Sequence, residues 1–291
     1  MPGAPYLYLG WGSPQNAVDV MNQTGVRAFT MAFMLSSGGC NPAWDGSRPL
    51  TGGTDEQTID AIHAAGGQVQ ISFGGWSGNK LGPNCSTPEA FAGAVQQVID
   101  VHHPEVVDFD IENSDEFENA DVQDRILRGL AIVKQNNPGI TIAVTFGTGL
   151  NGPNWWGTRL IDRAAELGTP IDNYTIMPFD FGATDMVAST ISASQGLRDA
   201  LKAARGWSDA EAYAHMGISG MNGVSDVGEI TTPSQWTQIR DWAVSHGLGR
   251  FAFWSVNRDR SCPGGDGGAA RSDCSSISQS DLEFTRITAG F

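Results

Sequence analysis

The chain alternates short apolar, β-branched or aromatic runs with longer amphipathic stretches, and the alternation repeats eight times. Short runs of this composition predict β-strands, and the amphipathic stretches predict helices. The strand-like runs are residues 6–10, 28–35, 68–73, 106–112, 141–146, 173–177, 215–219 and 250–255. The helix-like stretches lie near residues 14–24, 55–65, 88–102, 121–137, 156–168, 188–204, 233–246 and 279–288. Eight β/α units in 291 residues predict one domain, residues 1–291, of the α/β class, folded as a (β/α)8 TIM barrel.

The charge balance narrows the range of partners. The chain has 32 acidic and 17 basic residues, a formal net charge of −15, and no cluster of Lys or Arg. Nucleic acids and anionic membranes attract basic patches, so we expect neither as a partner. No apolar run is long enough to span a membrane, and no signal peptide is recognisable. We therefore expect the mature or cloned part of an exported protein, acting as a monomer.

The four cysteines lie in segments rich in Gly, Pro, Ser and Asn, without the spacing of a zinc site. This pattern predicts two surface disulfides, which are typical of secreted proteins. Four cysteines allow three connectivities. We expect Cys40 to pair with Cys85, tying two neighbouring loops, and Cys262 with Cys274, closing one loop.

The run from Val106 to Glu112 carries a carboxylate at every second position, while the intervening residues are apolar. Side chains alternate across a strand, so Asp108, Asp110 and Glu112 should point the same way. Three acids in an apolar setting repel one another and lose hydration, so at least one should hold its proton near neutral pH, as a general acid must. Glu112, at the end of the strand, is the first candidate. A salt-bridged strand face without catalysis is the alternative that this pattern leaves open.

In a (β/α)8 barrel the chemistry lies at the carboxyl ends of the strands and in the loops that follow them. Six of the nine tryptophans fall at such positions, as do all four cysteines. Indole rings gathered on a functional face are suited to stacking on the flat faces of sugar rings. The six tryptophans are Trp11, Trp44, Trp76, Trp155, Trp156 and Trp254.

Other motifs are weaker guides to function. Residues 147–152 match the Gly-x-Gly-x-x-Gly pattern of dinucleotide sites, but they follow the fifth strand and precede Pro153 and two tryptophans. We expect a flexible loop there and no cofactor. The acidic segment 113–124 lacks the ligand spacing of a calcium loop, and the five histidines show no metal-binding pair, so we expect no metal. No Gly-x-Ser-x-Gly elbow of a serine hydrolase is present.

Four segments together resemble the family 18 glycoside hydrolases, the chitinases and their relatives. Residues 105–112 resemble the family signature D-x-x-D-x-D-x-E, and residues 72–75 resemble its S-x-G-G motif. Residues 177–180 stand where the family carries M-x-Y-D, and Trp254 closes the eighth strand. The resemblance covers nearly the whole chain and is strongest to compact bacterial chitinases that lack the inserted α+β subdomain.

The resemblance implies a retaining mechanism in which the 2-acetamido group of the substrate replaces an enzyme nucleophile. Glu112 would protonate the glycosidic oxygen and then act as base on water. Asp110 would orient the acetamido group toward the anomeric carbon, and Asp108 would share a proton with Asp110. Trp254 would form the floor of the site. The other implied or expected binding residues are Gly74, Met177, Phe179, Asp180, Met221, Trp11, Trp76, Trp155 and Trp156.

Two positions depart from the family pattern. Glu105 replaces an Asp at the far end of the strand, where we expect little effect. Phe179 replaces a Tyr whose hydroxyl would hold the acetamido carbonyl, and losing one such donor typically slows a reaction by about 10²–10³-fold. Tyr6, Tyr8 and Tyr174 are the tyrosines on nearby strands, and strand parity places Tyr174 opposite to Phe179.

The resemblance leaves three functions in competition. The first is a secreted, endo-acting chitinase that cleaves chitin or chitooligosaccharides. The second is an endo-β-N-acetylglucosaminidase acting on N-glycans, which would use the same acids. The third is a chitin-binding lectin with weak or no activity, which Phe179 keeps open and the retained Glu112 opposes. The absence of the inserted subdomain indicates a shallow, open groove and hence endo cleavage.

Overall fold

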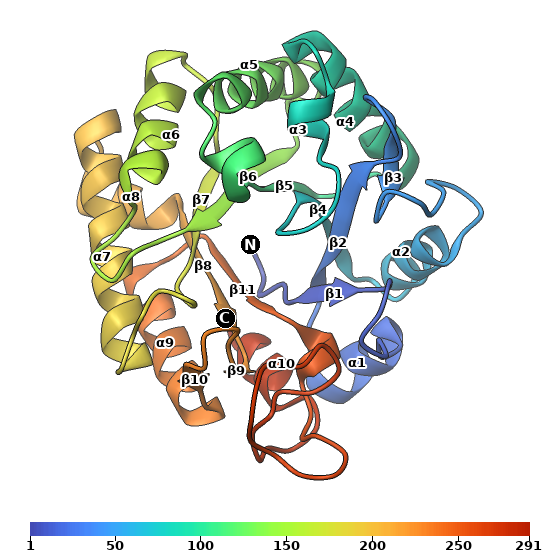
Figure 1. The fold of residues 1–291 in the computed structure, drawn as a ribbon, viewed down its shortest axis with the longest axis vertical. Helices are drawn as coiled ribbons and strands as arrows, with labels where there is room; N and C mark the ends of the chain where they lie inside the picture. The colour runs from blue at the N-terminus through green and yellow to red at the C-terminus, as the bar shows by residue number, and fades with distance from the viewer.

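The computed structural model describes all residues 1–291 and contains a nearly closed barrel of eight parallel strands surrounded by helices (Figure 1). Neighbouring strands pair in the order β1-β2-β4-β5-β6-β7-β8-β11. The two ends of the sheet meet where the Ala4 N–H donates to the Phe251 carbonyl at 2.9 Å. The barrel strands are β1 (Tyr6–Tyr8), β2 (Ala28–Ser36), β4 (Gln68–Gly74), β5 (Val106–Asp110), β6 (Thr141–Gly147), β7 (Asn173–Met177), β8 (Met216–Met221) and β11 (Arg250–Trp254). The predicted TIM barrel is confirmed.

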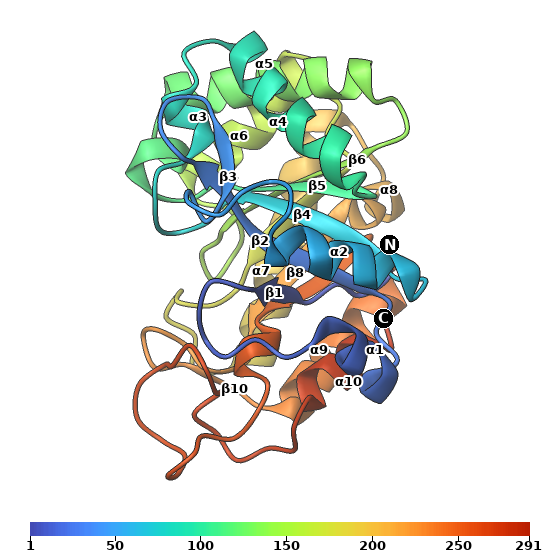
Figure 2. The ribbon, with the colours of Figure 1, turned by 90° about the vertical axis from the view of Figure 1, so that its right-hand side faces the viewer.

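Each predicted helix is also present and lies outside the barrel (Figures 1 and 2). Cap chemistry sets several boundaries: the Thr87 hydroxyl accepts the Ala90 N–H at the start of one helix, and Gly247 ends another in the left-handed conformation. The helices are α1 (Ala17–Thr24), α2 (Thr54–Ala64), α4 (Pro88–His102), α5 (Ala120–Asn136), α6 (Trp155–Glu166), α7 (Met186–Arg205), α9 (Pro233–His246) and α10 (Glu283–Thr288). None is both long and apolar enough to cross a membrane.

The loops contain several short helices and strands that the sequence pattern does not predict. In Figure 2, β3, α3 and β10 lie at the opposite end of the molecule from the N-terminus. Elements of two to six residues are too short to show a hydrophobic period, which explains why the sequence pattern does not reveal them. They are β3 (Pro42–Trp44), α3 (Leu81–Asn84), a π-helical turn (Asn113–Phe117), α8 (Asp209–Ala214), β9 (Gly223–Val224), β10 (Ile230–Thr231) and a 3-10 turn (Val256–Arg258).

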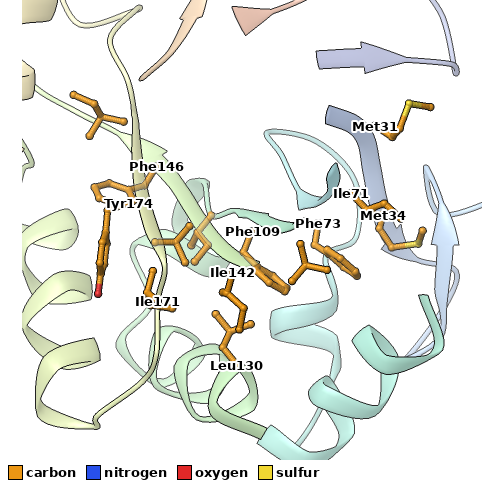
Figure 3. Close-up of a cluster of buried hydrophobic side chains, with 14 of the residues drawn as sticks. Met31, Met34, Ile71, Phe73, Phe109, Leu130, Ile142, Phe146, Ile171 and Tyr174 are labelled. Carbon is orange, nitrogen blue, oxygen red and sulfur yellow. The ribbon is translucent and has the colours of Figure 1, made fainter. Parts of the chain in front are cut away.

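The apolar core fills the layer between the barrel and its helices (Figure 3). Phe73 and Phe109, from neighbouring strands, stack with their ring centroids 5.0 Å apart. Leu130 of α5 lies in the same cluster. Because alternate residues of a strand face opposite sides, packing Phe109 outward turns Asp108 and Asp110 into the barrel. The core therefore determines which way the acidic side chains face.

Candidate active site

The acids of β5 lie where alternation predicts them. Asp108 and Asp110 are buried inside the barrel. The strand ends at Asp110, but the Ile111 N–H still donates to the Thr145 carbonyl at 2.8 Å, and Glu112 keeps an extended backbone. Glu112 is therefore at the carboxyl end of the barrel, on the same side as the two aspartates.

Asp108 is surrounded by donors. Its Oδ2 accepts the Tyr6 hydroxyl and the Ser72 hydroxyl, each at 2.8 Å. Its Oδ1 accepts the Thr145 hydroxyl at 2.6 Å and lies 3.4 Å from a guanidinium nitrogen of Arg250. Three hydroxyl donors and a buried guanidinium group therefore fix the position of this carboxyl group.

The environment raises the pKa values of the next two acids, Asp110 and Glu112, and so favours their protonated forms. Burial raises the pKa of Asp110 well above its ordinary value, and the charges of Glu112 and Asp108 raise it further. Burial also raises the pKa of Glu112 from 4.5 to about 7, with the nearby charge of Lys80 acting in the opposite direction and that of Asp180 adding to the rise. Asp110 Oδ1 is buried without a hydrogen-bond partner. The site thus offers a carboxyl group that can donate a proton near neutral pH.

Lys80, which was not predicted, is the buried cation nearest to this acid. Its ammonium group donates to the main-chain carbonyl of Glu112 at 2.9 Å and to Asp115 Oδ1 at 3.0 Å. The side chain is 1% exposed. Lys80 caps the start of the four-residue helix α3 and follows a glycine-rich loop, so no periodic pattern marks it as an interior residue.

Gly74 lets β4 approach β5 closely. The Gly74 backbone has φ +107°, and a Cβ atom there would lie 2.2 Å from the Asp110 carbonyl oxygen. The next N–H, that of Gly75, donates to the same carbonyl at 2.9 Å. Any side chain at residue 74 would displace Asp110, so this position requires glycine.

Four of the predicted binding residues lie at the carboxyl ends of β7 and β8 or just after β7. Met177 and Met221 end these two strands and are both buried. Asp180 has a left-handed backbone, φ +52°, and its charge acts on Glu112. Burial raises the pKa of Asp180 above its ordinary value. Phe179 is half-buried, and its side chain has no hydroxyl group.

No tyrosine hydroxyl is free to take over the missing role at Phe179. The Tyr6 hydroxyl donates to Asp108, and that of Tyr8 makes a short hydrogen bond to Asp45. Tyr174 points away from the barrel interior into the outer core, where its hydroxyl accepts an Arg205 N–H at 2.6 Å (Figure 3). The strand-parity prediction for Tyr174 is confirmed.

Trp254 lies in an aromatic cluster at the carboxyl end of the barrel. It stacks on Phe33, with ring centroids 5.5 Å apart and planes 14° from parallel. Tyr6, Tyr8 and Trp11 surround it at 5.9, 5.9 and 6.1 Å. The indole is only half-buried, so part of its surface remains accessible.

Three further tryptophans are exposed: one in the loop after β1, one in the loop after β4, and one at the start of α6. Trp11 is 47% exposed, Trp76 69% and Trp155 67%. Trp156 contacts Trp155 edge-on at 4.6 Å but packs partly against the outer core. Indole rings left exposed near the carboxyl ends of the strands are therefore candidates for stacking on a ligand.

The sixth tryptophan does not belong to this face, and its prediction was wrong. Trp44 is 0% exposed, and its ring N–H donates to His102 Nε2 at 3.2 Å. It lies on β3, an extra strand that pairs antiparallel with β2 and turns the ring toward α4. A strand of three residues is too short to show a hydrophobic period, so the sequence pattern predicts an exposed loop there.

The loop at residues 147–152 also differs from its prediction. Gly149 and Gly152 pair in a short antiparallel bridge, and Gly152 lies against Gly196 of α7 so closely that a Cβ would meet its backbone at 2.8 Å. The segment is a hydrogen-bonded turn packed on a helix, and not a free loop over the site.

Arg250 forms the charged centre of the barrel interior and was not predicted. It is fully buried at the start of β11. Its guanidinium donates to Gln70 Oε1 at 2.9 Å and to the Thr145 and Thr175 hydroxyls at 3.0 and 3.1 Å. The charges of Asp108 and Asp110 favour the charged guanidinium in turn. An Arg at the start of a strand is predicted from sequence to be solvent-exposed, and only closure of the barrel buries Arg250 in the interior.

Both predicted disulfides are present. Cys40 pairs with Cys85, joining the β2–β3 loop to the end of α3, and Cys262 pairs with Cys274 in the long loop after β11. No free cysteine remains. Both bridges therefore brace loops at the carboxyl end of the barrel, where the acids lie.

We compared the chain with protein-family models, curated proteins and solved structures. No protein-family model matches the chain. The chain is 28% identical over 289 residues to the "Probable bifunctional chitinase/lysozyme" of Escherichia coli, and 27% identical over 281 residues to "Endochitinase 11" of Metarhizium anisopliae. These matches cover 90% and 88% of the chain but only 31% and 52% of the relatives. The chain thus spans a third to a half of their length.

Among solved structures, the catalytic domain of a hyperthermophilic chitinase from Pyrococcus furiosus matches 99% of the chain and 93% of its own length, with 29% identity and a TM-score of 0.89. A structure of catalytic-site mutants of that enzyme's active domain 2, in complex with chito-oligosaccharides, matches equally well at 28% identity.

The barrel, with its proton-holding acid at a strand end and accessible aromatic rings around it, defines a glycoside hydrolase. In sequence and in structure the chain is similar to chitinases, and these similarities support a family 18 glycoside hydrolase.

Proposed function

We propose that this protein is a secreted, endo-acting chitinase that hydrolyses β-1,4 bonds between N-acetylglucosamine units with retention of configuration. The observation that carries the proposal is the carboxyl group of Glu112, whose pKa is raised to about 7 beside two further buried acids at the end of β5. The similarity to chitinases over 99% of the chain supports the substrate class.

In the first step, Glu112 gives its proton to the glycosidic oxygen as the bond from that oxygen to the anomeric carbon breaks. The acetamido carbonyl oxygen of the same sugar forms a bond to the anomeric carbon and yields an oxazolinium ion. In the second step, Glu112 takes a proton from water, whose oxygen attacks the anomeric carbon and restores the acetamido group. Two displacements at one carbon retain its configuration.

The two aspartates prepare the acetamido group for this attack. Asp110 has a buried oxygen without a partner, which is available to accept the acetamido N–H and aim its carbonyl at the anomeric carbon. Asp108, held in place by hydroxyl donors and by Arg250, shares with Asp110 the face of β5 that points into the barrel. A proton on Asp110 can be shared with this neighbour while the side chain changes partners.

The surrounding residues bind the sugars. Trp254 supplies the floor under the cleaved sugar, while Met177, Phe179, Asp180 and Met221 form its wall. Trp11, Trp76, Trp155 and Trp156 offer ring faces for sugars further along the chain. No inserted α+β subdomain interrupts the barrel, which favours an open groove and endo cleavage. Two disulfides favour export, and we propose that the protein acts as a monomer.

Product analysis tests this proposal. The protein would be incubated with a chitin hexamer and, in parallel, with a glycoprotein bearing N-glycans, and both mixtures followed by mass spectrometry. We expect internal cleavage of the hexamer to dimers, trimers and tetramers and no released glycan. Proton NMR of the first products should show the β-anomer. Glycan release without hexamer cleavage would identify an endo-β-N-acetylglucosaminidase, and no cleavage of either would indicate a lectin.

A further inference from the structure

The loops after β7 and β8 are locked together through the carboxylate of Glu229. Glu229 precedes β10, and its side chain crosses to the segment that follows β7. Its Oε1 accepts three successive backbone N–H groups, those of Phe181, Gly182 and Ala183, at 3.1, 2.7 and 2.8 Å. Its Oε2 accepts a fourth, that of Asp180, at 2.6 Å. Successive N–H groups that converge in this way form a concave anion site, and here a side chain of the same chain occupies it.

The contact is reciprocal. Asp180 Oδ1 accepts the Val227 N–H at 3.1 Å, so each loop supplies a carboxylate to the backbone of the other. The second loop is itself closed, because the Ser225 N–H donates to the Glu229 carbonyl at 2.8 Å and the Glu229 N–H donates to the Ser225 hydroxyl at 3.2 Å. We refer to Glu229, Asp180 and the N–H groups of residues 180–183 and 227 as the loop clamp.

The clamp decides where Asp180 lies relative to the acid. Asp180 has a left-handed backbone, which is costly for a residue with a side chain unless its surroundings hold it. The four hydrogen bonds from residues 180–183 to Glu229 supply that hold. The charged groups that act on Glu112 include Lys80, Asp110, Glu116, Asp180 and Asp226. Of these, Asp180 and Asp226 belong to the clamped loops.

We propose that Glu229 is a positioning residue for the hydrolase site: it fixes the loop after β7 so that Asp180 and Phe179 form the wall beside Glu112. This inference rests on the proposed function and extends it to a residue outside the reacting groups. The two strands that bear the clamped loops, β7 and β8, are neighbours in the barrel, so the clamp closes one sector of its rim.

A carboxylate is needed because both of its oxygens accept. An amide of the same shape presents one acceptor oxygen and one NH2 group. In Glu229→Gln the NH2 group would therefore face backbone N–H groups that need an acceptor, either those of residues 181–183 or that of Asp180. Residues 180–183 are exposed or only partly buried, so N–H groups that lose this acceptor would bond to water instead, and the loop would no longer be tied to residue 229. The variant changes the size of the side chain very little.

The test compares wild type with Glu229→Gln and with a matched control, Glu89→Gln, which neutralises an exposed glutamate on α4 that makes no hydrogen bond through its side chain. Hydrogen exchange followed by mass spectrometry reports on the amides of residues 180–183. Steady-state cleavage of a chitin hexamer across pH reports on the site. We expect Glu229→Gln to lose amide protection in that segment and to lower kcat/KM by roughly 10- to 100-fold, as a misplaced positioning group does.

The pH profile separates positioning from a general loss of folded protein. Release of the loop moves Asp180 away from Glu112, which removes a negative charge that raises the pKa of Glu112. The basic limb of the kcat/KM profile should then shift to lower pH, whereas partial unfolding would only scale the profile. Glu89→Gln should match wild type in every readout.

Two results would overturn the inference: unchanged protection of residues 180–183 in Glu229→Gln, or lost protection with an unchanged kcat/KM and basic limb. If neither wild type nor Glu89→Gln cleaves the hexamer, the proposed function fails and takes the positioning role with it. The exchange data then still decide whether the clamp itself exists.

Discussion

The protonation of Glu112 depends on its burial and on the charges of residues in several loops. Lys80 lowers the pKa of Glu112, whereas Asp180 and Asp226 raise it. A general acid must carry its proton, so activity should fall as the pH rises through about 7, where the Glu112 carboxyl ionises. The acids of β5 were predicted from their spacing, whereas Lys80 was not, because its position depends on a short loop that folds against the π-helical turn.

Lys80→Met tests this electrostatic balance. Removing the positive charge should raise the pKa of Glu112 and move the basic limb of the kcat/KM profile to higher pH, by about one unit. The measurement is the pH dependence of hexamer cleavage, with Lys202→Met on the surface of α7 as the control. A shift to lower pH in Lys80→Met would contradict the assignment of Glu112 as the acid.

The buried carboxyl group of Glu116 should make the free energy of unfolding depend on pH. It is buried beside Gly82, and burial raises its pKa from 4.5 to about 8. Below pH 4.5 the group is protonated in both the folded and the unfolded chain, so it does not weaken the fold. Between pH 4.5 and about 8 the unfolded chain gains free energy by ionising, and the folded state becomes less stable as the pH rises.

Glu116→Gln should remove this dependence. Its free energy of unfolding should equal that of wild type near pH 4.5 and exceed it by roughly 2–4 kcal/mol at pH 8. Urea unfolding followed by tryptophan fluorescence at the two pH values measures the difference, and Glu118→Gln, at an exposed neighbouring position, serves as the control. A variant less stable than wild type at pH 8 would show that Glu116 contributes to stability through its charge.

At the scale of elements, every long helix and barrel strand was predicted from periodicity and cap chemistry, because each has a buried face that repeats. The errors lie in short elements. The three-residue strand β3 places Trp44 in the outer core, whereas the sequence predicts an exposed ring at this position. The interior position of Arg250 has the same kind of cause: strand closure, which no local pattern encodes, surrounds it with hydroxyl groups.

The two disulfides differ in the length of chain that they close, 45 residues for Cys40–Cys85 and 12 for Cys262–Cys274. In the chain-entropy model, these loops correspond to about 4 and about 3 kcal/mol. Replacing Cys40 and Cys85 by Ser should therefore destabilise the protein more than replacing Cys262 and Cys274. Denaturant unfolding of the two double variants measures this order, and the reverse order would show that native-state packing outweighs loop entropy here.

For the whole molecule, the single barrel makes a prediction about unfolding. The core cluster of 57 residues draws on both halves of the barrel and on the surrounding helices, so no part has a core of its own. Calorimetry should show one transition whose calorimetric and van't Hoff enthalpies agree. Two separated transitions would contradict a single domain over residues 1–291.

The central claim is that Glu112 donates the proton for cleavage while the rest of the site binds the sugar. Glu112→Gln is nearly isosteric, but its amide cannot act as an acid at this pH. The decisive measurement pairs mass spectrometry of a chitin hexamer with calorimetric titration of the same oligomer, for wild type and Glu112→Gln. We expect the wild type alone to cleave the hexamer and both proteins to bind it with affinities within a few-fold of each other. A Glu112→Gln variant that kept most of the activity would contradict it.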